Sequence, residues 1–192
     1  FLTDQGVNAE RVGIAMVLAA AAVHTHLVRK GLRSYASINV RSAECLDTHY
    51  YAVLIGVGAT TVNAYLAEAA ITDRHARGLF GDLTLEQCLK RHRKAIDDGL
   101  LKIMSKMGIA VISSYRGGYN FEAVGLSRAL VADLFPGMPA KISGEGYASL
   151  HLNATMRHKA AYAAPPATLP IGGFYRQRAG GEAHAWTAEH MH

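Results

Sequence analysis

Cysteine and long hydrophobic runs are both scarce in this 192-residue sequence. Its two cysteines, Cys45 and Cys88, are too few and too far apart for a three-cysteine iron–sulfur motif. Isolated cysteines indicate a reducing cytosol, so we expect a cytoplasmic protein whose thiols pack in its core. The longest apolar run, Ile14–Val23, falls short of the roughly 20 residues that span a bilayer. We therefore expect no membrane contact, no signal peptide, and a buried helix over this run.

Charge of one sign is not concentrated in any part of the chain. Lysine and arginine number 20 against 15 aspartate and glutamate residues, which gives a formal net charge of +5. The basic residues are scattered, and the short run of Arg91, Arg93 and Lys94 fits the solvated face of a helix. Nucleic-acid binding requires a concentrated basic patch, so the pattern argues against it. Half of the residues (50%) are hydrophobic, which is enough for the core of one domain.

Motifs for catalysis or cofactor binding are also missing at the level of local spacing. The Gly56-Val57-Gly58 segment follows a predicted helix and lacks the third glycine of a dinucleotide fingerprint, so we interpret it as a helix-to-strand turn. His24 and His26 are two positions apart on a predicted helix and point in different directions, which argues against a shared metal ion. No Ser/His/Asp or Cys/His set can be assembled from spacing, and we expect hydrogen-bonding roles for these histidines.

Periodicity predicts strands that alternate with helices through the first half of the chain. Gly31 is suited to the left-handed cap of the first helix, after basic residues in its last turn. The predicted strands cover residues 1–3, 35–40 and 60–62, and the predicted helices cover residues 14–30, 45–55 and 64–77.

A long helix is predicted over Leu85–Met107. Thr84 and Gln87 form a capping-box pattern at its start, and Gly108 ends it. Gly99 lies inside this helix and predicts a bend or a frayed turn there, since glycine costs about 1 kcal/mol relative to alanine.

The residues after the long helix are predicted to continue the alternation. The apolar run Ile109–Ser113 predicts a strand covered on both faces, Gly117 and Gly118 a turn, and Phe121–Leu126 the start of a further helix. The fold class is therefore α/β, with a mostly parallel sheet and flanking helices. We expect the domain to cover residues 1–143, and residues 144–192 to be a linker and an extended C-terminal tail, because residues 163–170 contain three prolines.

Two long blocks of the chain carry an ordered and specific pattern of residues. Residues 99–125 read GLLKIMSKMGIAVISSYRGGYNFEAVG, and the block from His24 to Tyr65 contains HTHLVRKGLRSYASINV and LDTHYYAVLIGVGATTVNAY. Both blocks resemble the large chain of glutamate synthase. The first block is similar to the segment that joins the family's central domain to its flavin domain, and the second to the central domain itself. The resemblance covers most of residues 1–143 and resumes at 170–186. It implies a (β/α)-type central domain, with residues 144–192 leading into an FMN-binding domain.

The resemblance implies a parent enzyme that makes two glutamates from glutamine, 2-oxoglutarate and a reductant. Its partners would be the glutaminase and FMN domains of the same chain and a small reductase subunit, and its cofactors FMN and an iron–sulfur cluster. This sequence begins with Phe1 rather than a nucleophilic cysteine, and it lacks the family's flavin motif. We therefore expect an internal segment that carries no cofactor, is not catalytic alone, and serves as interdomain scaffold and ammonia-channel wall.

Five residues are candidates for an interdomain or channel role, and none is predicted to be catalytic. Ser105, Lys106 and Met107 end the long helix, where the resemblance favours contact with a neighbouring domain. Tyr115 and Arg116 follow the predicted buried strand at its carboxyl end, where open α/β sheets place ligands. A favourable interaction with the helix dipole also explains Lys106, and solvation or an ion pair also explains Arg116.

Two other functions remain open from the residues alone. The positive charge is compatible with a stand-alone α/β interaction module that binds an acidic partner. A small nucleotide-dependent enzyme is the third possibility.

Overall fold

The computed structural model describes residues 1–163, 171–172 and 177–186. Contacts divide the chain into two compact units, residues 1–155 and 156–192. The elements in chain order are β1 (Leu2–Thr3), α1 (Met16–Arg29), a 3-10 turn (Arg33–Tyr35), β2 (Asn39–Arg41), α2 (Thr48–Gly56), β3 (Thr61–Asn63), α3 (Tyr65–Ala76), α4 (Leu85–Lys106), α5 (Ile112–Tyr115), β4 (Val124–Leu126), α6 (Arg128–Leu134), β5 (Ile142–Glu145) and α7 (Tyr147–Tyr162).

The described strands form two small parallel sheets. In the first, β2 lies between β1 and β3, and Val40 is opposite Leu2 on one side and Val62 on the other. In the second, β4 pairs with β5, with a register irregularity between Val124 and Leu126. The α/β class with parallel strands and flanking helices is thus confirmed, although the strands divide between two sheets instead of extending one.

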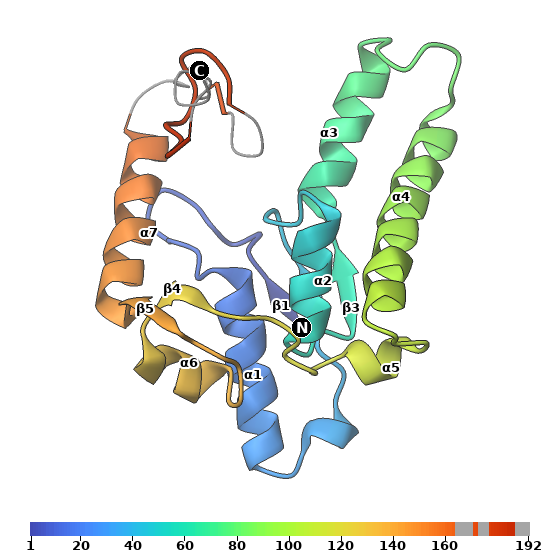
Figure 1. Ribbon diagram of the computed structural model, residues 1–192. Helices are drawn as coiled ribbons and strands as arrows, with labels where there is room; N and C mark the ends of the chain where they lie inside the picture. The colour runs from blue at the N-terminus through green and yellow to red at the C-terminus, as the bar shows by residue number, and fades with distance from the viewer. Residues whose placement is uncertain (164–170, 173–176, 187–192) are drawn as a thin grey trace. The chain divides into compact units, whose positions relative to one another are not determined.

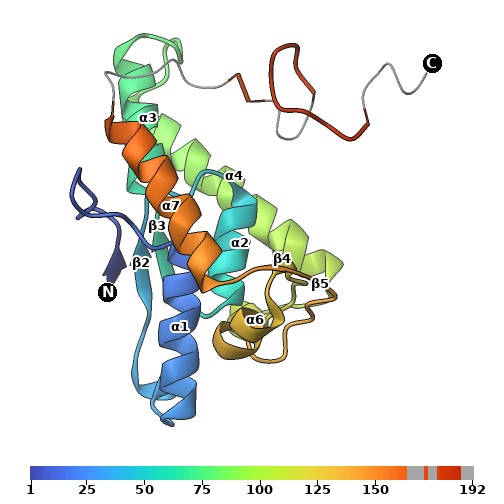
Figure 2. The ribbon, with the colours of Figure 1, turned by 90° about the vertical axis from the view of Figure 1, so that its left-hand side faces the viewer.

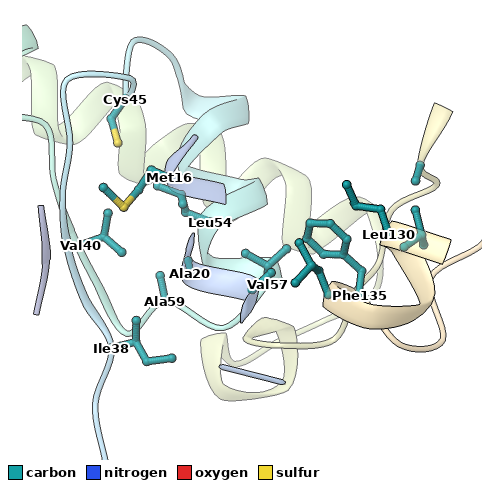
Figure 3. Close-up of a cluster of buried hydrophobic side chains, with 14 of the residues drawn as sticks. Met16, Ala20, Ile38, Val40, Cys45, Leu54, Val57, Ala59, Leu130 and Phe135 are labelled. Carbon is teal, nitrogen blue, oxygen red and sulfur yellow. The ribbon is translucent and has the colours of Figure 1, made fainter. Parts of the chain in front are cut away.

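The core of the first unit lies between the three-stranded sheet and helices α1 and α2 (Figures 1 and 2). The apolar helix predicted from Ile14–Val23 is α1, whose Ala20 and Ala21 are fully buried, and small side chains allow the close approach of its neighbours. Figure 3 shows members of this cluster converging from the sheet, α1, α2 and the region of α6, among them Met16, Val40, Cys45, Leu54, Leu130 and Phe135.

Glycine ends the helices where the sequence predicts it. After α1, Gly31 has φ +68°, its amide donates to the Val28 carbonyl, and the Leu32 amide donates to the Leu27 carbonyl. This pair of bonds is a Schellman motif, which satisfies carbonyls that the helix leaves free. The capping box of Thr84 and Gln87 is also present at the start of α4. Both predictions are confirmed because they depend on neighbouring residues alone.

The strand predicted over Ile109–Ser113 is wrong. Gly108 and Ile109 close α4 in a Schellman motif, with the Ile109 amide 2.9 Å from the Met104 carbonyl oxygen. The chain then forms the short helix α5, and Val111 and Ile112 are 56% and 38% exposed. The apolar run therefore does not pass between two layers of helices, and no strand within the described ranges pairs with it.

The helix predicted over Phe121–Leu126 is also wrong, since this segment contains strand β4. Gly125 has φ +79°, which a right-handed helix does not accommodate. Ser127 instead caps the next helix, because its Oγ accepts a hydrogen bond from the Leu130 amide at 3.3 Å. An N-cap serine therefore moves the start of the helix to Arg128.

Two further boundaries shift, and Gly99 has a packing role. The strand expected at residues 35–40 is confined to Asn39–Arg41, and the helix expected at residues 45–55 begins at Thr48, where the Asp47 carboxylate caps it. Helix α4 is continuous through Gly99, and a Cβ on this glycine would lie 2.5 Å from Thr48 Cγ2. Gly99 thus permits the close approach of α2 to α4 that the structure shows.

Candidate interdomain face and the two ends of the sheet

Ser105, Lys106 and Met107 lie exposed at the C-terminal end of α4. Apolar side chains occur beside them in the sequence: Leu101 is 61% exposed, Met107 43%, Val111 56% and Ile112 38%. We call residues 101–112 the α4–α5 face. These exposed apolar side chains are compatible with a surface that a neighbouring domain covers.

Tyr115 and Arg116 lie outside residues 101–112, and the argument from a buried strand does not apply to them. Tyr115 is only 1% exposed and packs with Ala52 and Met104, while its hydroxyl has no hydrogen-bond partner within the described ranges. Its surroundings raise its pKa by desolvation. Arg116 follows α5, not a strand, and it lines a cavity that contains none of the three residues at the end of α4.

A cavity of about 490 Å³ lies near the amino ends of β2 and β3, since Arg33 in its lining donates to the carbonyls of Ala36 and Gly58, which precede these strands. Its polar lining comes from His24, Arg33, Ser34, Ser113 and Arg116, and we call it the arginine cavity. Arg33 is fixed there by three hydrogen bonds to neutral acceptors: its Nε donates to His24 Nδ1 at 2.9 Å, and its terminal nitrogens donate to the carbonyls of Ala36 and Gly58. The arrangement holds a guanidinium without neutralising its charge.

His24 is the residue around which the arginine cavity is built. Burial, followed by the nearby Arg33 charge, lowers the pKa of His24, so the neutral ring accepts the hydrogen bond from Arg33. A Cβ on Gly58 would lie 2.2 Å from His24 Nδ1, and one on Gly117 would lie 2.9 Å from Cε1. Both glycines have positive φ, and both leave the space that the imidazole occupies. The sequence indicated a hydrogen-bonding role for His24 but gave no sign of its pairing with Arg33.

The carboxyl ends of the same strands carry a second polar cluster. Asp4, just after β1, accepts hydrogen bonds from Ser42 Oγ at 2.6 Å, from the Ala43 amide at 2.8 Å and from the Tyr65 hydroxyl at 2.9 Å. Glu44 accepts from the Tyr50 hydroxyl and from the amide of Met16, the first residue of α1. We call Asp4, Ser42, Glu44, Tyr50 and Tyr65 the carboxyl-end cluster.

Each carboxylate of the carboxyl-end cluster therefore has donors from side chains or backbone. Glu44 also lies at the positive end of the α1 dipole, which favours its negative charge. Arg41 lies 5.4 Å from the centroid of the Tyr65 ring, in cation–π contact. Desolvation and the neighbouring carboxylates raise the pKa of Cys45 to about 12, so this buried thiol stays protonated and unreactive. The sequence did not identify this cluster, because Asp4 and Tyr65 are far apart along the chain.

The donor sets of the described residues do not fit a metal ion or an iron–sulfur cluster. No group of three or more His, Cys, Asp or Glu side chains comes together in the part of the chain that the structure describes. Cys45 belongs to the main core, whereas Cys88 lies on α4 outside that cluster. Over the same ranges, no helix has both the length and the apolar character that crossing a membrane requires.

Comparison with known proteins confirms the resemblance seen in the sequence. The family described as the glutamate synthase central domain matches residues 1–127. The chain is 59% identical over 191 residues to the glutamate synthase [NADPH] large chain of Azospirillum brasilense, with 100% of this chain and 13% of the relative covered. It is 38% identical over 192 residues to the corresponding large chain of Bacillus subtilis, again with 100% and 13% covered. For the ferredoxin-dependent glutamate synthase of Pyropia yezoensis, the identity is 37% over 193 residues, covering 94% and 12%. The chain thus spans about an eighth of the length of these relatives.

Proposed function

This chain belongs to the glutamate synthase central-domain family, and on that premise we propose that it is a non-catalytic scaffold within a glutamate synthase large chain. The whole enzyme would convert glutamine, 2-oxoglutarate and a reductant into two molecules of glutamate in the cytoplasm. The glutaminase centre would release ammonia, and an internal channel would carry it to the centre where glutamate forms. Residues 1–143 would form part of the central domain and of the channel wall, and residues 144–192 would lead into the FMN domain.

The single observation that carries this proposal is the α4–α5 face. Leu101, Met107, Val111 and Ile112 are between 38% and 61% exposed, and Ser105 and Lys106 lie exposed among them in sequence. Apolar side chains cost free energy in water, roughly 25 cal/mol for each Å² of apolar surface left exposed. A neighbouring domain of the same large chain would remove this cost. We therefore propose that this face packs against the glutaminase or the FMN domain.

The polar chemistry of the first unit supports a scaffold role over a catalytic one. The carboxylates of the carboxyl-end cluster are occupied by hydrogen bonds within the fold, and the thiol of Cys45 is buried and protonated. FMN, when bound by another domain, would supply the reducing electrons, and an iron–sulfur cluster would also belong to other parts of the enzyme. The relatives include enzymes named for NADPH and for ferredoxin. We therefore expect this segment not to select the electron donor or to bind a small reductase subunit by itself.

The test uses the full-length large chain that contains this segment. Met107→Glu and Val111→Glu would place charge in the α4–α5 face and weaken its contact with the neighbouring domain. We expect more ammonia to escape into solution for each glutamine hydrolysed, and less glutamate to form from it. Leu79→Glu is the matched control, since Leu79 is 56% exposed and lies in the turn between α3 and α4. Unchanged ammonia retention in both face variants would refute the proposed contact.

A further inference from the structure

The arginine cavity concentrates positive charge without a negative counterpart. Arg33 and Arg116 both line it, and its lining contains no Asp or Glu among the residues that the structure describes. The ion pairs among the described residues join Arg29 to Asp133, Arg77 to Asp73, Arg93 to Glu68 and Lys94 to Asp98. The two cavity arginines belong to none of these pairs.

Arg116 also has an unused donor. Its Nε is buried from solvent and has no hydrogen-bond partner in the described part of the chain. A buried donor without an acceptor is unfavourable, and more so when the group is charged. Burial and then the charge of Arg116 lower the pKa of Arg33, which is the electrostatic sign that the two guanidinium groups repel each other. An anion placed between them would offset the repulsion between the two guanidinium groups.

The cavity is preorganised for such a ligand. Arg33 is held in place by His24 Nδ1 and two backbone carbonyls, so little side-chain entropy remains to be lost on binding. Ser34 and Ser113 add hydroxyl donors to the lining. Guanidinium groups bind carboxylate and phosphate oxygens through pairs of hydrogen bonds, a geometry that a lysine ammonium does not reproduce.

We propose that the arginine cavity binds an oxyanion, a carboxylate or a phosphate group, between Arg33 and Arg116. The proposal is independent of the contact proposed for the α4–α5 face, because the cavity contains none of Ser105, Lys106 and Met107. Two sources can supply the same chemistry: a small free anion, or a carboxylate side chain from another part of the large chain.

The first measurement is calorimetric titration of the full-length large chain and of the 192-residue chain with inorganic phosphate at constant ionic strength. A free-anion site gives saturable binding in both, and Arg116→Gln lowers the affinity at least about tenfold, the loss of one charged hydrogen-bonded contact. Arg91→Gln is the matched control, since it removes one positive charge from an exposed position on α4 and should leave the affinity within about twofold. Arg116→Lys separates the loss of charge from the loss of guanidinium geometry, because it keeps the charge and removes the guanidinium.

A carboxylate side chain from the same large chain gives a different result. The full-length chain then does not bind phosphate, while Arg116→Gln, and not Arg91→Gln, lowers its melting temperature. Failure of the full-length chain both to bind phosphate and to respond to Arg116→Gln would overturn the proposal. That outcome leaves the ammonia-retention experiment on the α4–α5 face unaffected, so the two proposals fail separately.

Discussion

The two ends of the three-stranded parallel sheet differ in how the charged groups beside them are hydrogen-bonded. At the carboxyl ends, Asp4 and Glu44 accept hydrogen bonds from Ser42, Tyr65, Tyr50 and the backbone. Near the amino ends, the acceptors that Arg33 has among the described residues are all neutral. Arg116 there retains a buried Nε without a partner within the described ranges.

The difference separates polar groups that hold the fold from polar groups available to a ligand. Donors and acceptors that satisfy each other stabilise a structure modestly, but removing one of them leaves the other buried and unpaired. Substitutions in the carboxyl-end cluster should therefore reduce stability. Substitutions at the unpaired arginine should reduce binding and leave stability nearly unchanged.

The largest expected effect comes from the backbone beside His24. Gly58→Ala would place a methyl group 2.2 Å from His24 Nδ1 at a residue with φ +116°. We expect a loss of about 3 kcal/mol or more in the free energy of unfolding, measured by urea denaturation, from overpacking and backbone strain together. Gly31→Ala is the control, since φ is +68° but no atom lies within 4 Å of the added methyl, and it should cost about 1–2 kcal/mol. Equal losses would show that the imidazole moves freely out of the way.

The second effect concerns the carboxyl-end cluster. Asp4→Ala removes the acceptor of three hydrogen bonds and leaves the fully buried Ser42 hydroxyl without that partner. We expect a loss of about 2–4 kcal/mol in the free energy of unfolding. Asp4→Asn keeps one acceptor oxygen, so its free energy of unfolding should fall between those of the unchanged chain and Asp4→Ala. Gln5→Ala, at the exposed neighbouring position, should change stability by less than about 0.5 kcal/mol. A loss at Asp4 no greater than at Gln5 would contradict the comparison.

The third effect is a dependence of stability on pH through His24 in the arginine cavity. The pKa of His24 is lower in the folded chain than the ordinary 6.5, mainly through burial and then through Arg33. The unfolded chain therefore takes up the proton first, and stability should fall as pH drops below 6.5. Above that value the contribution is fully present. The urea midpoint should therefore fall with pH between pH 7 and pH 5. His24→Gln should flatten this dependence, whereas His26→Gln, on the exposed side of α1, should preserve it.

The smallest effect is the most informative for the arginine cavity. Arg116→Gln removes a charge that no carboxylate neutralises in the described part of the chain, so we expect the free energy of unfolding of the 192-residue chain to change by less than about 0.5 kcal/mol. The variant should be slightly more stable, since the repulsion between Arg116 and Arg33 is relieved. A loss as large as that of Asp4→Ala would mean that Arg116 is a structural residue, and the contrast between the two ends would disappear.

Much of the fold follows from neighbouring residues and was predictable for that reason. The helix ends at Gly31 and Gly108, and the helix start at Thr84 and Gln87, were predictable because hydrogen bonds between residues a few positions apart fix them. The family was also predictable, since the ordered residues of the two resembling blocks carry it directly. Of the candidate face, Ser105, Lys106 and Met107 were identified from the sequence, and their contact with a neighbouring domain stays a prediction.

The tertiary structure decided what depends on contacts between distant residues. An apolar run such as Ile109–Ser113 fits either a buried strand or a helix end with an exposed turn, and only the presence of a pairing strand distinguishes them. Asp4 and Tyr65 meet because parallel strands bring their carboxyl ends together, and Gly58 and Gly117 matter because both abut one imidazole. The sequence by itself thus determined the family, the α/β class and the helix ends that are set by local capping, whereas long-range packing alone determined which charged groups of the described residues have hydrogen-bond partners and which do not.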